Sequence, residues 1–169
     1  MLVEVVVWAL AEDQKNHVPV VILKDLAGER KLPIWIGPQE ASVIAMELAE
    51  RKFPRPLTHD LLNSMLRGLG AKVQRVEICD LVENTFYAKI FIDSGNGILC
   101  IDARPSDSIA LALKAKARIY VDPKLFSGEF DALLSETSKA ADGDDEQRAE
   151  ELKDFIEKLD PRDFGKFRF

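Results

Sequence analysis

The sequence is poor in the residues that hold small disulfide-bonded or metal-stapled proteins together. Its 169 residues include two cysteines and two histidines. Cys79 and Cys100 both lie inside apolar stretches and do not form a Cys-x-x-Cys pair, so we expect two buried free thiols. A chain of this length buries about two thirds of its unfolded surface when it folds. The composition therefore excludes a disulfide framework and a zinc cluster, and the fold needs neither.

Long hydrophobic runs are also missing. The longest uninterrupted apolar run is the seven residues Val5–Ala11, whereas a membrane-spanning helix needs about 20. An acid, Glu4, stands where a secretory signal carries basic residues, and no small-residue cleavage site follows the apolar stretch. We therefore expect a cytoplasmic protein that does not span a membrane.

The chain has no excess of positive charge. It contains 23 Lys and Arg against 29 Asp and Glu, for a net charge of −6, which argues against non-specific binding of nucleic acid through bulk electrostatics. The acidity is confined to one end of the chain. Residues 1–126 contain 16 basic and 16 acidic residues, whereas residues 127–169 contain 7 and 13. The neutral first part of the chain can still carry a local basic patch.

Hydrophobic periodicity predicts an α+β fold with a mostly antiparallel sheet and three core helices. The predicted strands are residues 3–10, 18–23, 31–36, 72–79, 85–93, 97–102 and 118–121. One helix is expected to begin at Pro38 and end near Arg51 and Lys52, and another to begin at Pro105, because proline favours the first helical position. Thr58 is the expected N-cap of the remaining helix. No internal repeat is visible.

The last part of the chain has a different pattern. Residues 140–145 are small and acidic and predict a linker. Beyond them, one face of an amphipathic helix ending at Pro161 carries Ala149, Leu152, Phe155, Ile156 and Leu159. We therefore divide the chain into a domain of residues 1–126 and an acidic linker with a C-terminal helix over residues 127–169. This unpartnered helix, together with the apolar first strand around Trp8, predicts a homo-oligomer.

One candidate site is the segment Pro54-Arg55-Pro56-Leu57-Thr58-His59-Asp60. Its prolines stiffen a loop that presents Arg55 just before a helix N-terminus, which suits an anion such as phosphate. His59 can serve as a general base or a metal ligand. The structural alternative is that Thr58 caps the helix, Asp60 complements its dipole, and His59 is an ordinary satisfied histidine.

A second candidate site is the segment Asp102-Ala103-Arg104-Pro105-Ser106-Asp107-Ser108, where a strand runs into a helix. Carboxylate oxygens on a tight turn suit Mg²⁺ or Mn²⁺, and Asp102 and Asp107 are the candidate ligands. The structural alternative pairs Arg104 with either aspartate and lets Ser106 or Asp107 cap the helix. This segment has no standard metal-ligand spacing.

Two weaker features accompany these segments. Glu40 stands in the first turn of a predicted helix and can either add a carboxylate to the site or complement the helix dipole. The aromatic residues of Thr85-Phe86-Tyr87 can stack on bases or pack in a core. No Gly-rich phosphate loop, His-x-x-x-His pair or Gly-x-Ser-x-Gly elbow occurs, which disfavours nucleoside-triphosphate enzymes and serine hydrolases.

Four ordered segments within residues 1–126 resemble the bifunctional nuclease family. They are Leu32-Pro33-Ile34-Trp35-Ile36-Gly37 with Glu40-Ala41, Pro54-Arg55-Pro56-Leu57-Thr58-His59-Asp60-Leu61, Thr85-Phe86-Tyr87-Ala88, and Ile101-Asp102-Ala103-Arg104-Pro105-Ser106-Asp107-Ser108-Ile109-Ala110-Leu111-Ala112. The resemblance implies a small α+β domain that acts on DNA and RNA with the help of a divalent metal. Ser108 departs from it, because the family more often has alanine there.

The residues and the resemblance together predict a metal-assisted nuclease without strong sequence preference, with nucleic acid as its partner. The expected catalytic residues are His59, Asp60, Asp102 and Asp107, and the expected substrate-binding residues are Arg55, Arg104, Thr58 and Ser106. Of these, Asp102, Asp107 and Asp60 would hold Mg²⁺ or Mn²⁺, and His59 would orient or deprotonate the attacking water. The alternative is a non-catalytic anion-binding or regulatory module in which the same side chains form an ion-pair network.

Overall fold

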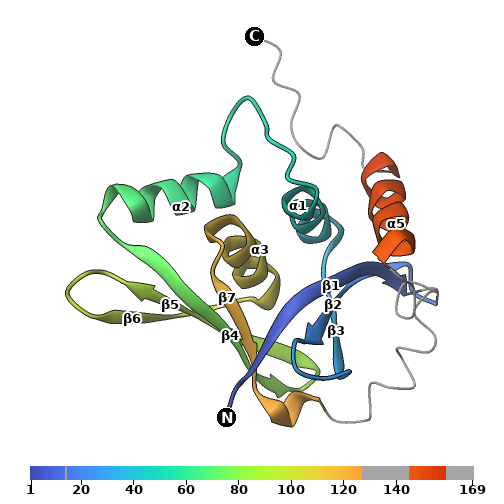
Figure 1. The fold of residues 1–169 in the computed structure, drawn as a ribbon, viewed down its shortest axis with the longest axis horizontal. Coiled ribbons are helices and arrows are strands. Elements are labelled where there is room, and N and C mark those ends of the chain that lie inside the picture. Colours follow the sequence, from blue (N-terminus) through green and yellow to red (C-terminus); the bar gives the residue numbers. More distant parts are fainter. Residues whose placement is uncertain (14, 127–144, 159–169) are drawn as a thin grey trace.

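The computed structural model describes residues 1–13, 15–126 and 145–158. It confirms the expected α+β fold: seven strands form one sheet, and helices pack against it (Figure 1). In chain order the elements are β1 (Val3–Asp13), β2 (Val18–Asp25), β3 (Lys31–Trp35), α1 (Pro38–Leu48), α2 (Thr58–Gly68), β4 (Lys72–Val82), β5 (Thr85–Asp93), β6 (Ile98–Ala103), α3 (Pro105–Ala115), β7 (Arg118–Val121), the short 3-10 helix η1 (Pro123–Leu125) and α5 (Asp145–Lys158).

Several element boundaries differ from the expectation by a few residues, and two of these differences have a clear cause in the backbone. Helix α1 ends at Leu48, before the expected cations, because Glu50 adopts a left-handed conformation with φ of 50°. Strand β4 continues to Val82, so the expected five-residue turn shrinks to Glu83 and Asn84. Both of these residues have positive φ, 48° and 60°, which is the requirement of a type I′ hairpin turn.

The sheet is built from two similar halves. Its strand order is β3-β2-β1-β7-β4-β5-β6, so two antiparallel meanders flank the short strand β7. Strand β7 pairs antiparallel with β1 and parallel with β4. Each meander is followed by a helix that begins with proline, Pro38 in α1 and Pro105 in α3. No internal repeat in the sequence marks this repeated arrangement. The arrangement gives Glu40 and Asp107 the same position in the first turns of α1 and α3.

The hydrophobic core lies mainly between the helices and the sheet. Ile44 of α1 and Ile109 of α3 are fully buried there against strand residues such as Val76 and Ile78. A smaller apolar cluster of residues from β1 and β2 packs with the half-buried Trp8 and Trp35. Among the described helices, none is long and apolar enough to cross a membrane.

Helix α5 packs against the core of its own chain. Ile156 is 8% exposed and joins the main cluster, with Leu152 and Phe155 packed around it. The Arg148 guanidinium lies 3.3 Å from the centroid of the Trp8 ring and donates a hydrogen bond to the Trp8 carbonyl. The expected amphipathic helix is therefore present, and its apolar face is used within the chain. Residues 140–144, Leu159 and Pro161 lie outside the described residues.

The expectation of two buried thiols is wrong. Both cysteines are free, but Cys79 is half-buried and Cys100 is exposed. Cys100 belongs to β6, which forms one edge of the sheet and is exposed along nearly all its length. An apolar stretch does not by itself distinguish an edge strand from a buried one.

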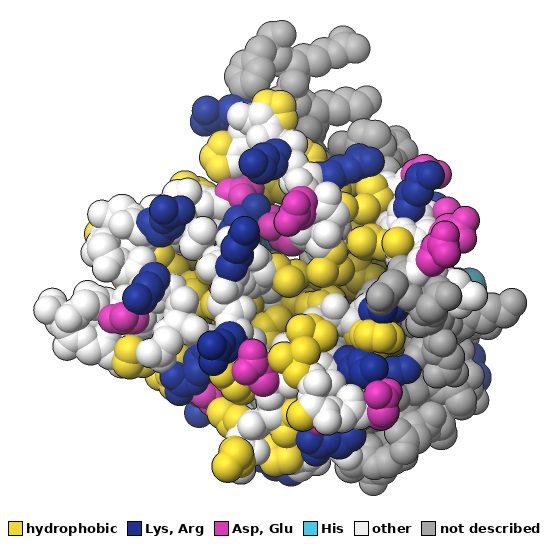
Figure 2. All heavy atoms as spheres, in the orientation of Figure 1, with side chains coloured by type: hydrophobic (Ala, Val, Ile, Leu, Met, Phe, Trp, Pro, Cys, Tyr) yellow, Lys and Arg dark blue, Asp and Glu magenta, His cyan; other side chains and the backbone are white. Residues whose placement is uncertain are grey.

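One lysine links the three core helices. The Lys114 ammonium of α3 lies 2.5 Å from a carboxylate oxygen of Glu47 in α1 and 2.5 Å from one of Asp60 in α2. Figure 2 shows acidic and basic side chains side by side over the helices on this face. Burial alone would raise the pKa of Asp60, but the hydrogen bond from Lys114 and that from the Leu57 N–H bring it below its ordinary value. Burial alone would lower the pKa of Lys114, and its two carboxylate partners raise it instead.

We predict that Lys114→Met destabilises the protein by about 1–3 kcal/mol at neutral pH, because it leaves two half-buried carboxylates facing each other. The pKa of Asp60 is lowered on folding from 3.8, so its stabilising contribution exists above that pH and is lost as the pH falls through the folded value. The deficit of the variant should therefore persist down to that pH and shrink as the pH is lowered further below it. Urea unfolding at neutral pH and at about pH 3 measures it.

Lys72→Met is the matched control, since Lys72 forms an exposed pair with Asp93 at 3.6 Å. It should change the free energy of unfolding by less than about 1 kcal/mol. A Lys114→Met deficit that equals the control, or that does not change with pH, would contradict the structural role of Lys114.

Candidate functional site

A cleft of about 280 Å³ lies between the two meanders. Its walls come from β3, the start of α1, the β4–β5 turn and the start of α3, and the residues are Ile34, Trp35, Ile36, Gly37, Glu40, Asn84, Thr85, Phe86, Arg104, Pro105 and Ser106. Strands β3 and β5 are separated by four other strands in the sheet, so the sheet curls to bring them to one cleft. Three of the four segments singled out in the sequence therefore line the same cavity.

Arg104 holds the two halves of the site together. Its Nη1 donates to Glu40 Oε1 at 3.0 Å, and its Nε donates to Asp107 Oδ2 at 2.8 Å. The charge and hydrogen bond of Asp107, followed by those of Glu40, raise the pKa of Arg104 above its already high value. The Arg104 side chain is 66% exposed and its guanidinium has five N–H donors, so several remain for a ligand in the cleft. Arg104 is thus paired with Asp107, as in the structural alternative, and still has N–H donors open to the cleft.

His59 joins the site from α2 and brings in the remaining segment. Its Nε2 lies 3.4 Å from Asp107 Oδ1, and its side chain is 15% exposed. Its Nδ1 is buried and has no hydrogen-bond partner among the described residues. Because one ring nitrogen faces Asp107 and the other is enclosed, His59 is placed to orient Asp107 rather than to take a proton from water in the cleft.

Glu40 is the carboxylate that lines the cleft. It lies in the first turn of α1, and its side chain is 25% exposed. Gly37 leaves room for it, because a β-carbon at position 37 would stand 2.2 Å from Glu40 Oε2. Glycine at this N-cap therefore lets the carboxylate fold back over the helix start, within reach of Arg104.

Two helices begin at the cleft, which favours a negatively charged ligand. The N-caps of α1 and α3 are Gly37 and Arg104, and each helix has proline as its first residue. The first N–H groups of a helix have no intrahelical acceptor, and the positive end of the helix dipole lies there. Together with the open N–H donors of Arg104, these groups can hold a phosphate.

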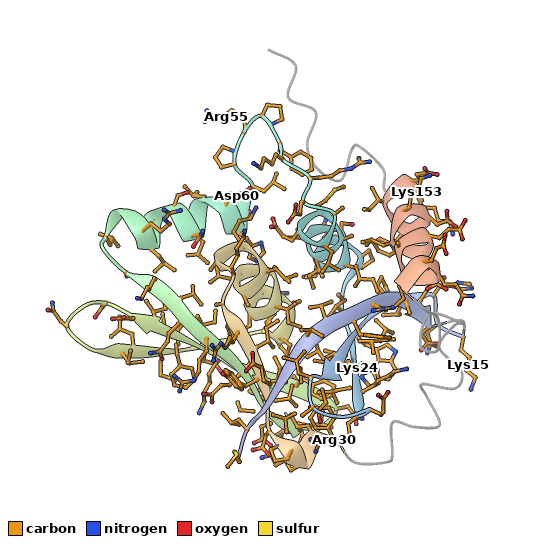
Figure 3. The ribbon with its side chains drawn as sticks, viewed as in Figure 1. Lys15, Lys24, Arg30, Arg55, Asp60 and Lys153 are labelled. Carbon is orange, nitrogen blue, oxygen red and sulfur yellow. The ribbon has the colours of Figure 1, made fainter. Side chains whose placement is uncertain are left out.

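Of the other predicted substrate-binding residues, one lines the cleft and two are exposed outside its lining. Ser106 is buried and lines the cleft. Thr58 is exposed and is the first residue of α2; Leu57, rather than Thr58, is the N-cap, and its N–H is bound by Asp60 at 2.8 Å. Arg55 is exposed at the outer end of the loop before α2 (Figure 3). Among the described residues, Arg55 has no hydrogen bond or ion pair that joins it to Arg104 or Asp107.

Asp102 lies on the opposite face of the sheet from the helices. It pairs with Lys89 in the ladder between β5 and β6, and its neighbour Ile101 pairs with the buried Ile90. Paired residues share a face and successive residues alternate, so Ile101 faces the helices and Asp102 faces away. Asp102 and Asp107 are five residues apart in the sequence, but the structure does not bring their carboxylates together in a shared site.

The predicted metal ligands do not form a metal-binding group. The part of the chain that the structure describes contains no cluster of three or more His, Cys, Asp and Glu side chains placed to share a metal ion. Asp102 faces away from the helices, Asp60 is engaged by Lys114, and Asp107 is engaged by Arg104 and His59. These donors do not fit a resident Mg²⁺ or Mn²⁺.

The sequence patterns give Glu40 only as a weaker feature and assign no role in the site to Asn84, Trp35 or Gly37, which line the cleft. Glu40 is 64 residues from Arg104, so no local pattern connects them. One sequence signal could have linked Glu40 to the site. A helix that begins with proline and has an acid two residues later occurs at Pro38 and again at Pro105.

Comparisons with known proteins find related sequences. An uncharacterized protein of Mycobacterium tuberculosis is 38% identical over 163 residues, which cover 95% of this chain and 97% of the relative. Bifunctional nuclease 1 of Arabidopsis thaliana is 27% identical over 116 residues, or 67% of this chain and 36% of that protein. Bifunctional nuclease 1 of Oryza sativa subsp. japonica is 23% identical over 116 residues, with 67% and 35% covered.

The sequence profile described as the bifunctional nuclease domain matches residues 21–130. This range is more than half of the 169 residues and contains the cleft, Arg104 and both of its carboxylate partners. The chain therefore belongs to the bifunctional nuclease domain family.

Proposed function

We propose that this protein hydrolyses phosphodiester bonds of nucleic acid, with the scissile phosphate held at Arg104. The observation that carries the proposal is the exposed guanidinium in a cleft where two helices begin. Such groups stabilise the negative charge that develops on a phosphoryl oxygen in the transition state. The names of the plant relatives, bifunctional nucleases, support the same chemistry.

Glu40 is the proposed general base. It is the carboxylate that lines the cleft, and Arg104 binds its Oε1 at 3.0 Å, so an attacking water between phosphate and carboxylate is within reach. The water adds to phosphorus, Glu40 accepts its proton, and one ester oxygen leaves with the bonding electron pair. Asp107 and His59 act as positioning residues, because Asp107 binds the guanidinium at Nε, a different nitrogen from the one that binds Glu40, and His59 faces the other oxygen of Asp107.

The proposed substrates are DNA and RNA, without strong sequence preference. Arg104 and the helix N-termini contact phosphate, and phosphate contacts carry no sequence information. Dependence on Mg²⁺ or Mn²⁺ stays a prediction from the sequence. A cleavage assay therefore has to include both metals and a chelator.

The direct test is cleavage of end-labelled single-stranded DNA and RNA by the full chain in Mg²⁺, Mn²⁺ or EDTA. We expect Arg104→Gln to lower kcat/KM by about 100-fold, as is typical when one donor to a developing oxyanion is removed. Glu40→Gln should lower kcat by at least about 100-fold with little change in KM, because it removes only proton transfer.

Arg118→Gln is the matched control, since Arg118 is a 71% exposed arginine that pairs with Glu4 and does not line the cleft. It should cleave at the wild-type rate. Equal cleavage by the wild type and Arg104→Gln would contradict the proposal and reveal a contaminating nuclease.

A second candidate function is phosphate binding without hydrolysis. It is favoured by the pairing of Arg104 with both Glu40 and Asp107, which is typical of a structural ion network. Binding of nucleic acid that is lost in Arg104→Gln, with no cleavage by any variant, would establish this function instead.

We also propose that two copies of the chain associate through β6. The edge strand β3 carries Lys31 and Pro33, which discourage pairing with another chain, whereas β6 carries neither and keeps a regular register with β5. Two copies of the same edge strand can pair antiparallel across a two-fold axis, because each copy then presents the same edge to the other. Helix α2, at the same end of the molecule (Figure 1), has no buried residue. Its exposed apolar side chains are Leu61, Leu62, Met65 and Leu69.

Light scattering during size-exclusion chromatography should give the mass of a dimer at micromolar concentration. Ile101→Lys, at a position that is 44% exposed on β6, should give a monomer, because it places a charge in the paired edge. Val82→Lys, at an apolar position that is 47% exposed on β4, should leave the dimer intact. A monomeric wild type contradicts the association.

A further inference from the structure

The two helix starts at the cleft differ in what they present to it. In α1, Glu40 lines the cleft, whereas the residue before it, Gln39, is exposed and does not line it. In α3 the order is reversed, because Ser106 lines the cleft and the acid after it, Asp107, does not. A residue with a carboxylate therefore lines the cleft at one helix start, and a residue with a hydroxyl lines it at the other.

A carboxylate already covers the start of α1. Glu40 folds back there over Gly37, which has no β-carbon in its way. A phosphate placed at this helix start would meet the negative charge of Glu40, and like charges repel strongly at such short range. The positive end of the α1 dipole is therefore used within the protein.

The start of α3 has no such cover. Its first-turn acid, Asp107, is bound to Arg104 Nε at 2.8 Å and faces His59 Nε2 at 3.4 Å. Arg104 is the N-cap, and its side chain does not cap the helix. Pro105 has no N–H, so the first donors of α3 are the backbone N–H groups of Ser106 and Asp107, which have no intrahelical acceptor.

Ser106 adds an unused hydroxyl at the same place. It is 7% exposed, and it lines the cleft. Among the described residues, its hydroxyl has no hydrogen-bond partner, and it is not one of the unpartnered polar atoms that are fully enclosed. Buried polar groups are normally hydrogen-bonded, so a hydroxyl that opens only to a cleft is available to a ligand.

The other buried serines of these two helices use their hydroxyls internally. Ser42 of α1 donates to the Pro38 carbonyl at 2.7 Å, and Ser108 of α3 donates to the Arg104 carbonyl at 2.9 Å. Neither of them lines the cleft. Ser106 is therefore the buried serine of these helices whose hydroxyl is left for a ligand.

We infer that Ser106 binds the phosphate that Arg104 holds, through its hydroxyl and together with the N–H groups at the start of α3. A phosphate oxygen accepts hydrogen bonds from all of these donors. This inference rests on the proposed function and gives the two helix starts different tasks. The start of α3 binds the phosphate, and the start of α1 supplies the proposed proton acceptor.

The test is an NMR titration of the full chain with inorganic phosphate that follows the Asp107 amide and the Ser106 β-carbon. Both signals should shift and saturate together. Ser106→Ala should raise the Kd for phosphate at least about tenfold, the lower end for losing a hydrogen bond to a charged group. Its melting temperature should match that of the wild type, so that the loss is that of the hydroxyl and not of the fold.

Ser42→Ala is the matched control, because Ser42 is a buried serine at 3% exposure in the other helix and does not line the cleft. It should bind phosphate as the wild type does. In the cleavage assay, Ser106→Ala should raise KM more than it lowers kcat, since the hydroxyl already contacts the phosphate of the bound substrate.

The results separate this inference from the proposed function. A Ser106→Ala protein that binds phosphate as tightly as the wild type overturns the role of Ser106, and cleavage that depends on Arg104 would still support the nuclease. Equal weakening in Ser42→Ala also overturns it. Phosphate binding that depends on Ser106, without cleavage by the wild type, would support this inference and contradict the nuclease.

Discussion

The position of one guanidinium depends on both halves of the sheet. Arg104 binds Glu40 and Asp107, which occupy equivalent places in the first turns of α1 and α3. These helices follow different meanders, so their starts meet only because the sheet curls across β7. The cleft, its charge and its opening to solvent all follow from this meeting. A change that separates the two meanders would therefore disrupt the site.

The two helix starts are similar in form but different in role. Gly37 caps α1 and leaves space for the folded-back carboxylate of Glu40, whereas Arg104 caps α3 and supplies the cation. One half therefore contributes the proposed proton acceptor and the other the proposed phosphate-binding group. His59 extends the second half by holding Asp107 from α2. This division of roles explains why Glu40, Arg104 and His59 lie on separate segments of the sequence.

Much of the fold could be predicted from local patterns. Alternating residues located β5 and β7, and prolines located the starts of α1 and α3, because these signals act within a few residues. The edge position of β6 could not be predicted in this way, so Cys100 was wrongly expected to be buried. Whether a strand lies at the edge or in the centre of a sheet is decided by its pairing with strands that are distant in the sequence.

The candidate site was predicted in part. Arg104, Asp107 and His59 were selected for their chemistry, and the structure brings them together. The family motif and the tight turn group Asp102 with them, but strand alternation turns Asp102 to the other face of the sheet. Glu40 comes from the other half of the sheet, and Asn84 and Phe86 come from the β4–β5 hairpin. Their role depends on the curl of the sheet, which no local pattern encodes.

The most direct test of the central claim is an NMR titration with inorganic phosphate that follows backbone amides and arginine Nε–H signals. We predict that the largest shifts occur at the Arg104 Nε–H and at the amides of Glu40, Ser106 and Asp107, all at the cleft or at the helix starts beside it. Shifts that centre on Arg55 and the loop before α2, or no saturable shift at Arg104, would contradict it.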